Sequence, residues 1–296
     1  MHDVIVVGGS YAGMAAALQL LRARRRVVVI DAGRRRNRFS RAAHGFLGQD
    51  GVEPGEIARS ARRQLEAYPT LDWVEDEAQL AAGTRDDFTV TMASGATVQG
   101  RRLLFALGVH DELPAIEGLA ERWGCSVFHC PYCDGYELGR GRIGVIATGP
   151  MSMHQALLVK EWGEVTLFTH AGFVPDADQR AALAAGSIAL EETPVARLEG
   201  HAQVVLADGR RLDFAGLFTA PRNRPASAVA ESLGCALEET PFGTQLRTDE
   251  TKETSIPGAF ASGDAARVPH SVTLAVADGA WAGMQLHRSL VFPAAH

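Results

Sequence analysis

The sequence predicts an α/β fold with two dinucleotide-binding (Rossmann-like) domains, the second inserted into the first. Three observations indicate this architecture. A glycine-rich turn joins a β-branched segment to a helix near the amino terminus, and a Gly-Asp turn follows a short apolar segment near the carboxyl terminus. A second strand–turn–helix segment lies between them.

The first strand–turn–helix segment has the order that a dinucleotide site requires. A β-branched strand over 4–7 ends in Gly8, a turn through Ser10 and Gly13 opens a helix, and a second β-branched strand ends in Asp31. Gly8 permits the tight turn, the small Ser10 lets backbone N–H groups approach a pyrophosphate, and Gly13 lets helix and strand pack closely. We expect Asp31 to accept hydrogen bonds from the ribose of NAD or FAD. Ser10 stands where a central glycine is usual.

Residues 254–266 favour FAD over NAD. This segment resembles the second flavin-binding segment of flavoprotein oxidoreductases that have two dinucleotide-binding domains. Gly263 permits close approach of a ligand, and Asp264 is a plausible acceptor for ribityl hydroxyl groups. A helix predicted over 271–283 follows, and its first residues, Ser271 and Val272, would bring backbone N–H groups to the flavin ring. A simple Asp-containing turn is the alternative.

The middle of the chain carries the pattern Cys130-Pro-Tyr-Cys133, preceded by Cys125 and His129. Three interpretations compete. The four side chains could hold zinc, although structural zinc sites usually draw on two separated ligand pairs. A glutaredoxin-like domain also uses this tetrapeptide, but close to its own first strand. The third interpretation, which we favour, is a disulfide that exchanges electrons with a flavin.

The order and spacing of these three motifs resemble the low-molecular-weight thioredoxin reductase family over nearly the whole chain. The CPYC variant is similar to a branch of FAD-dependent dithiol oxidases that close disulfides in small natural products. The resemblance implies an FAD-binding domain made of residues 1–111 and 238–296, an NAD(P)H-like domain over 112–237, and a homodimer. It also implies roles for three residues at the motif: Cys133 next to the flavin, Cys130 as the exchange thiol, and Asp134 as an acid/base group.

The second domain departs from the reductase pattern. Its turn keeps Gly149 but continues with Pro150, which has no N–H for a phosphate. After the next strand, Thr169 and His170 stand where the reductases have arginines for the NADPH 2′-phosphate. We therefore expect the fold without tight NADPH binding. His270, in place of an arginine of the reductases, is a candidate base for substrate thiols; a solvated histidine at a helix start is the alternative.

Composition excludes several classes of protein. The net charge of −6, from 29 Lys and Arg against 35 Asp and Glu, argues against nucleic-acid binding. No stretch approaches the roughly 20 apolar residues of a membrane span, and no cationic leader precedes the first strand, so we expect a cytoplasmic protein without a membrane partner. Four cysteines are too few for a disulfide framework, and we assign Cys235 to core filling. The arginine runs 24–26 and 34–36 are expected on the solvated surface.

Together these observations predict an enzyme in which a small dithiol reduces Cys130 and Cys133, and the cysteines reduce FAD. The alternative is NADPH-dependent reduction of a small disulfide or a thioredoxin-like protein. A third hypothesis is an FAD-holding redox sensor without turnover. We assign no metal to the chain. No short motif identifies the dithiol, because a pocket that recognises shape leaves no such pattern.

Overall fold

The computed structural model describes residues 1–170 and 173–292, which form two compact units. The first unit contains residues 1–38, 46–110 and the chain from 223 onward; the second contains 39–45 and 111–222. This division differs from the predicted domains in two places. The segment 223–237 lies in the first unit because Val229, Ala230 and Cys235 pack into its core. The segment 39–45, which we had placed in the first domain, makes its contacts in the second unit.

The first unit is built on a seven-stranded sheet in the order β3-β2-β1-β6-β5-β4, with β19 paired to β6. Strands β3, β2, β1, β6 and β19 are parallel, and β5 and β4 are antiparallel additions. The strands are β1 (His2–Val7), β2 (Val27–Ile30), β3 (Leu71–Val74), β4 (Ala78–Thr84), β5 (Asp87–Met92), β6 (Thr97–Phe105) and β19 (Ala259–Ala261). The helices of this unit are α1 (Tyr11–Arg22), α2 (Pro54–Glu66), α6 (Val229–Ser232) and α7 (Val272–Val291), with short 3-10 turns η1 (Arg36–Phe39) and η4 (Gly263–Ala266).

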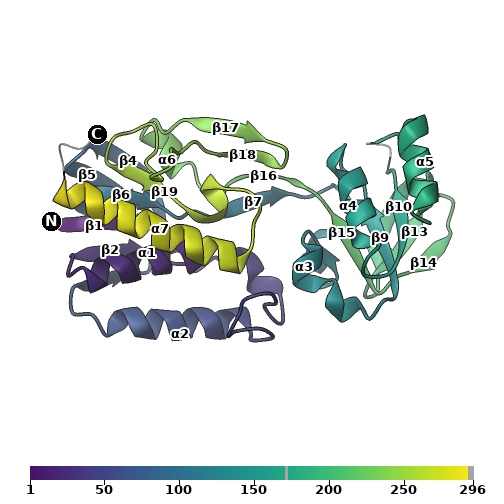
Figure 1. The fold of residues 1–296 in the computed structure, drawn as a ribbon, viewed down its shortest axis with the longest axis horizontal. Helices are drawn as coiled ribbons and strands as arrows, with labels where there is room; N and C mark the ends of the chain where they lie inside the picture. The colour runs from purple at the N-terminus through teal and green to yellow at the C-terminus, as the bar shows by residue number, and fades with distance from the viewer. Residues whose placement is uncertain (171–172, 293–296) are drawn as a thin grey trace. The chain divides into compact units, whose positions relative to one another are not determined.

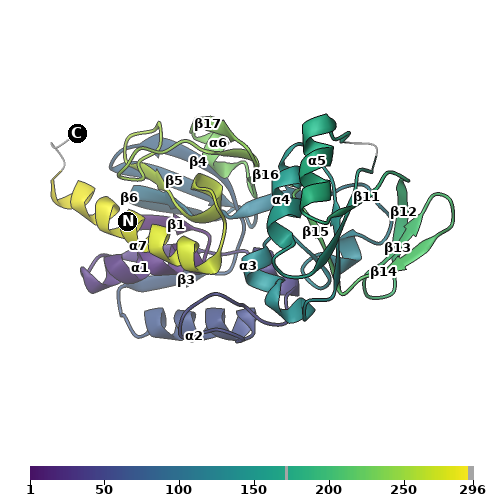
Figure 2. The ribbon, with the colours of Figure 1, turned by 45° about the vertical axis from the view of Figure 1, so that its right-hand side comes forward.

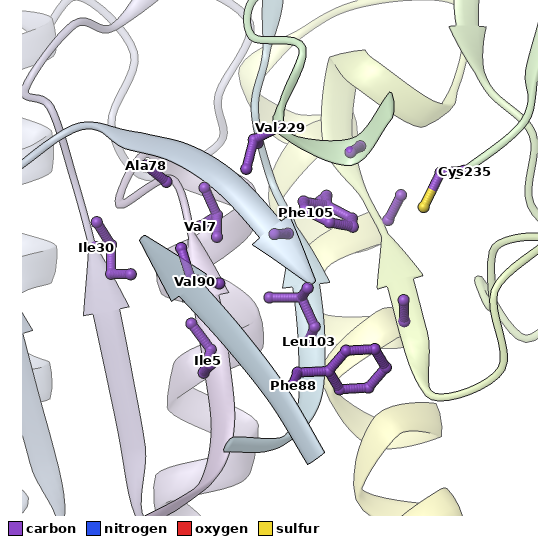
Figure 3. Packing of buried hydrophobic residues seen from close by; sticks show 14 of the residues in the cluster. Ile5, Val7, Ile30, Ala78, Phe88, Val90, Leu103, Phe105, Val229 and Cys235 are labelled. Carbon is purple, nitrogen blue, oxygen red and sulfur yellow. The ribbon is translucent and has the colours of Figure 1, made fainter. Parts of the chain in front are cut away.

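Side chains of the first unit's sheet point alternately to its two faces, and both faces are covered by other parts of the unit. Ile5, Leu103 and Phe105 point to one face, where Phe88 and Val90 of β5 and the α6 segment with Cys235 pack on them (Figure 3). The intervening residues Val4, Val6, Val27, Val29 and Leu104 point to the opposite face, against α1, α2 and α7. Because both faces are buried, the parallel strands are continuous apolar runs rather than alternating ones.

Helices α1 and α7 lie side by side on this second face (Figure 1). Two glycines of α7 make the close approach possible. A Cβ atom at Gly279 would lie 2.1 Å from the carbonyl oxygen of Ala12, and one at Gly283 would lie 2.6 Å from that of Ala16. Helix α7 runs on to Val291, beyond the predicted end at Gly283, because these glycines are contact points rather than helix breakers.

A four-stranded sheet has the order β17-β18-β16-β7, and two of the passages of the chain between the units fall within β7 and β16. These strands are β7 (Val109–Glu112), β16 (Arg222–Pro225), β17 (Leu237–Thr240) and β18 (Gly243–Leu246).

The second unit has a five-stranded parallel sheet in the order β11-β10-β9-β15-β8 and a three-stranded antiparallel sheet β12-β13-β14. Its strands are β8 (Val127–Phe128), β9 (Arg142–Ile146), β10 (Glu164–Phe168), β11 (Ala189–Glu191), β12 (Val195–Glu199), β13 (Gln203–Leu206), β14 (Arg211–Asp213) and β15 (Gly216–Thr219). Its helices and 3-10 turns are η2 (Ala120–Arg122), α3 (Pro131–Asp134), η3 (Tyr136–Leu138), α4 (Met151–Val159) and α5 (Ala177–Ala185).

The parallel sheet of the second unit is also covered on both faces (Figure 2). Ile143 and Val145 of β9 pack with Ala156 of α4 and Leu183 of α5. The next residue, Ile146, points to the opposite face, where the strands β12 and β13 pack. The predicted α/β class is confirmed. No helix within the described ranges is long and apolar enough to cross a membrane.

Candidate functional site

The turn after β1 is shaped so that only glycine fits at two positions. Gly8 has φ +104°, and a Cβ atom there would lie 2.2 Å from the carbonyl oxygen of Ala106. A Cβ atom at Gly13 would lie 1.8 Å from the carbonyl oxygen of Gly8. Ser10 is the N-cap of α1, but its hydroxyl makes no capping bond to the described chain, and the first turn has no acidic residue. Backbone N–H groups at this helix start can therefore bind an anion.

Asp31 lies at the end of β2, next to this turn. Its Oδ1 accepts a hydrogen bond from the Gly9 N–H at 3.1 Å. Asp31, Gly9 and Trp73 line a cavity of about 560 Å³ within the first unit, together with Arg59 and Glu75. This volume is in the range of small-molecule sites. The turn and the cavity provide a helix N-terminus for a phosphate and a carboxylate beside it for ribose hydroxyl groups.

Asp264 follows β19, and one of its oxygens has no partner among the described residues. Oδ1 is buried without a hydrogen bond to the described residues, and Oδ2 lies 3.4 Å from Nη1 of Arg36. Gly263 has φ +72°, and a Cβ atom there would lie 2.7 Å from Cβ of Ala12 in α1. A buried carboxylate oxygen without a donor is costly unless a ligand supplies one. A ligand rich in hydroxyl groups fits this requirement.

A largely buried ion pair between Lys252 and Asp278 binds the backbone of the turn at Gly263. The carboxylate of Asp278, on α7, accepts from the Gly263 N–H at 2.8 Å and lies 3.2 Å from Nζ of Lys252. Lys252 also donates to the carbonyl oxygen of Ala266 at 3.0 Å. The pair therefore fixes both ends of the short η4 turn that carries Asp264.

The start of α7 presents the remaining predicted residues of this unit. A cis peptide bond joins Val268 and Pro269, and His270 follows it. The hydroxyl oxygen of Ser271 accepts from the Leu274 N–H at 3.1 Å, so Ser271 caps the helix, and Val272 is its first residue. Nη1 of Arg36 donates to Nδ1 of His270 at 3.0 Å. Because a guanidinium only donates, Nδ1 is the acceptor and Nε2 carries the ring proton.

The second unit contains the cysteine pair. Cys130 and Cys133 are joined by a disulfide, with their Cα atoms 5.3 Å apart. Cys130 is the N-cap of α3, and Tyr132 between the two cysteines is well exposed, as is Tyr136. Cys125 is a free, exposed thiol. The residues that the structure describes contain no cluster of three or more His, Cys, Asp or Glu suited to a metal ion.

Asp134 directly follows the second cysteine and has an unusual proton affinity. Burial, together with the negative charge of Glu137, raises the pKa of Asp134 to about 7, and His44 opposes this shift. A carboxyl group with a pKa near neutrality can both give and take a proton at physiological pH. The geometry therefore places a potential acid/base group beside the disulfide.

The turn after β9 offers little to a nucleotide. The Thr148 N–H donates to the hydroxyl of Ser152 at 2.9 Å, and Pro150 precedes the first residue of α4. Burial lowers the pKa of His170, so its imidazole is neutral at pH 7. The guanidinium of Arg180 is engaged with Glu192 at 2.6 Å. Positions 169 and 170 are threonine and a neutral histidine. A nucleotide bound here would need a carboxylate for its ribose or a cation for a 2′-phosphate at these positions.

The model of the pyridine nucleotide-disulphide oxidoreductase family matches residues 2–279. The chain belongs to this family.

Within the family, the oxidoreductase is thioredoxin reductase-like. It is similar to thioredoxin reductase tcpT of Claviceps purpurea, with 31% identity over 98% of this chain and 94% of the relative, and to thioredoxin reductase sirT of Leptosphaeria maculans, with 30% identity over 96% and 92%. Among solved structures, an oxidoreductase from Agrobacterium tumefaciens has 55% identity, a TM-score of 0.96 and 99% coverage of both chains. The structure of HlmI has 35% identity and a TM-score of 0.90, covering 98% of this chain and 92% of that one.

The predicted site residues of the oxidoreductase fall into three groups in the structure. Gly8, Ser10, Gly13 and Asp31 gather at one turn of the first unit, and Gly263, Asp264, His270, Ser271 and Val272 gather around the start of α7. Cys130, Cys133 and Asp134 lie together in the second unit.

Sequence reasoning missed four residues of this oxidoreductase: Arg36, Lys252, Asp278 and His44. The prediction that the run 34–36 is solvated is wrong for Arg36, whose side chain is only 17% exposed and contacts Asp264 and His270. Lys252 and Asp278 carried no local pattern because their partners are distant in sequence. His44 lies in the segment 39–45, which falls within the predicted FAD-binding domain 1–111 but belongs to the second unit.

Proposed function

We propose that this oxidoreductase binds FAD in its first unit and oxidises a small dithiol to a disulfide through Cys130 and Cys133. The proposal depends most on the turn after β9, which has Pro150 and a neutral His170 where an NADPH-dependent enzyme needs phosphate ligands. An enzyme of this family that does not bind NADPH must take its electrons from another donor. A dithiol that reduces the cysteine pair is the source closest to its chemistry.

The residues of the first unit fit FAD. The N–H groups at the start of α1 would hold the pyrophosphate, Asp31 the adenosine ribose, and Asp264 the ribityl hydroxyl groups through its unpartnered oxygen. The start of α7 would face the flavin ring. When bound, FAD would supply a two-electron acceptor for the reduced cysteine pair, with oxygen or another compound as the final electron acceptor.

The thiol chemistry on the protein side balances without further reagents. One substrate thiolate attacks Sγ of Cys130, a mixed disulfide forms, and Cys133 leaves as a thiolate. The second thiolate of the substrate then attacks the substrate sulfur that is bonded to Cys130, and Cys130 leaves as a thiolate. The substrate loses two electrons and two protons and gains one S–S bond, while the cysteine pair gains the electrons. Asp134 is the group that takes up and returns a proton during these transfers.

The alternative function, NADPH-dependent reduction of a disulfide, is favoured by the names of the curated relatives, which are called thioredoxin reductases. In that direction the same cysteines would pass electrons outward to a small disulfide or a thioredoxin-like protein. The two directions share every residue of the cysteine site and differ only in the source of electrons.

Anaerobic mixing of the FAD-loaded protein separates the two functions. We expect a small dithiol such as dithiothreitol to bleach the flavin absorbance, and one equivalent of NADPH to leave it unchanged over the same time. Rapid bleaching by NADPH would refute the oxidase proposal. Turnover is tested by oxygen consumption with excess dithiol; bleaching without turnover would instead support a redox sensor. Cys130→Ser and Cys133→Ser are expected to abolish dithiol-driven bleaching while the flavin remains bound.

A further inference from the structure

The segment 39–45 lies against the cysteine motif within the second unit. The carbonyl oxygen of Phe39 accepts a hydrogen bond from Sγ of Cys125 at 3.3 Å. A Cβ atom at Gly124 would lie 3.2 Å from Cβ of Phe39, and one at Gly45 would lie 3.8 Å from the carbonyl oxygen of Tyr132. We call residues 39–45 the strap. The strap is far from the cysteines in sequence, yet it delivers a titratable side chain, His44, to their surroundings.

His44 reaches the acidic group that follows the disulfide. Its Nε2 lies 3.5 Å from Oε1 of Glu137, which is in η3, three residues after Asp134. Among the described residues, Glu137 and His44 are the charged groups that act on Asp134, and they act in opposite directions. The His44 and Glu137 side chains are 23% and 42% exposed, so solvent reaches both.

We propose that His44 and Glu137 are positioning residues that together set the proton occupancy of Asp134 during thiol-disulfide exchange at Cys130–Cys133. The proposal rests on the function proposed above, in which Asp134 moves protons at this disulfide. An acid/base group works best when it is part protonated and part ionised at the working pH. A carboxylate that opposes ionisation and a histidine that favours it act on this buried carboxyl group in opposite directions.

The two residues predict shifts of opposite sign. His44→Gln removes the side chain that favours ionised Asp134, so the pH at which Asp134 titrates rises. Glu137→Gln removes the negative charge that opposes ionisation, so that pH falls. We expect each shift to be about one pH unit, the size typical of a single charge nearby. His154→Gln and Glu161→Gln are matched controls, because both side chains are exposed in the same unit and neither acts on Asp134.

The experiment measures opening of the disulfide itself, so that it does not depend on the flavin. The full-length FAD-loaded protein is mixed anaerobically with dithiothreitol between pH 5 and 9, quenched with acid, and treated with N-ethylmaleimide. Intact mass then counts the freed thiols. Rates are divided by the thiolate fraction of dithiothreitol at each pH, which leaves the titration of the protein. Asp134→Asn identifies the inflection that belongs to Asp134, because that inflection disappears in the variant.

The expected result is an inflection near pH 7 in the wild type that moves up in His44→Gln, down in Glu137→Gln, and stays in place in both controls. Unchanged inflections, or shifts of the same sign, would overturn the proposal, since loosened packing would move both variants alike. Circular dichroism establishes that each variant is folded, and Glu137→Gln provides the test by itself if His44→Gln is not. The failure of the proposed function looks different: dithiothreitol then opens the disulfide without bleaching the flavin.

Discussion

Arg36 shows how a single side chain can differ from its neighbours in sequence. Three consecutive arginines are equivalent by composition, and a solvated run is the natural expectation for them. The η1 turn instead directs the third one inward, where its guanidinium contacts Asp264 at 3.4 Å and His270 at 3.0 Å, while the side chain of Arg34 is 67% exposed. No local rule distinguishes these residues, because the partners of Arg36 lie more than 220 positions away.

Replacement of Arg36 should weaken FAD binding. In Arg36→Met, Asp264 loses its cationic partner and His270 loses the donor that fixes its tautomer, so we expect the FAD dissociation constant to rise about tenfold, equivalent to about 1.4 kcal/mol. Fluorescence titration of the apoprotein with FAD measures this constant. Arg63→Met, on the exposed face of α2, serves as the control. Equal affinities for the two variants would show that Arg36 does not support the flavin site.

Asp134 should make folding stability depend on pH. Its pKa is raised to about 7 from an ordinary value of 3.8, so the folded protein holds a proton that the unfolded chain releases between these values. The stabilising contribution is therefore complete below about pH 4 and is lost as the pH rises through about 7. Asp134→Asn should stabilise the protein at pH 8.5 by roughly 2–4 kcal/mol, and much less at pH 4.5.

Urea unfolding of wild type and Asp134→Asn at the two pH values measures this difference. Asp87→Asn, an exposed aspartate in β5, should show no such pH dependence. A stabilisation by Asp134→Asn that is equal at both pH values would contradict the assignment.

At the scale of single residues, the sequence predicted what local backbone geometry determines. Gly8 and Gly13 are required because a Cβ atom at either position would collide with a carbonyl oxygen a few residues away or on the neighbouring strand. The Lys252–Asp278 pair could not be found in this way. A lysine and an aspartate separated by 26 positions have no pattern until the fold brings Nζ and Oδ2 to 3.2 Å.

Helix α7 shows the same limit for a whole element. Its start was predicted within one residue because Pro269 precedes it, but its predicted end at Gly283 is eight residues short. Glycine lowers helix propensity, so glycines inside a helix suggest an end. In this helix they are retained because α1 packs directly on them.

Substitution of Gly279 tests that packing. The added methyl group of Gly279→Ala would lie 2.1 Å from the Ala12 carbonyl oxygen, so α7 must move away from the first turn of α1. We expect a loss of about 1–3 kcal/mol in the free energy of unfolding, together with weaker FAD binding, since Ala12 belongs to the turn that would hold the pyrophosphate.

Gly149→Ala is the matched control for Gly279→Ala. No atom lies within 4 Å of a Cβ at Gly149, and its φ is not positive, so we expect a change of under about 0.5 kcal/mol. Thermal and urea unfolding compare the two variants. Helix propensity and chain entropy both favour alanine over glycine, so a loss in Gly279→Ala no larger than in Gly149→Ala would show that contact with α1 does not limit residue 279.

At the scale of the whole molecule, the two ends of the chain meet in one unit, and Arg102 of β6 helps to join them. Its fully buried guanidinium donates to the hydroxyl and carbonyl oxygens of Ser289 in α7 and to Asp86. Arg102→Met should lower the free energy of unfolding by about 2–4 kcal/mol, because the buried groups of Ser289 lose their partner.

Arg101→Met provides a direct comparison with Arg102→Met. Arg101 also binds Asp86, but its side chain is 37% exposed, so we expect a loss below about 1 kcal/mol. Chemical denaturation of both variants measures the two losses in the free energy of unfolding. Similar losses would mean that the contact with Asp86, and not the hydrogen bonds of Arg102 to Ser289, stabilises the unit.

The domain boundaries were only partly predictable. The motifs located the two dinucleotide folds, but nothing in the sequence of 223–237 shows which core it joins. Cys235 was correctly assigned to a core, and the structure shows that this core is the one around Phe88 and Val90, more than 140 residues earlier. A choice between two cores depends on contacts of this sequence separation, which a local pattern does not contain.

The strap affects how the second unit could be exchanged by recombination between related chains. Because residues 39–45 belong to the second unit, the chain passes between the units four times, and the second unit is not one continuous stretch of sequence. A recombination event that exchanged residues 111–222 between two relatives would carry the disulfide, Asp134 and Glu137 with it, but would take His44 from the other parent. Such chimeras would keep their redox cysteines but combine residue 44 of one parent with Glu137 and Asp134 of the other.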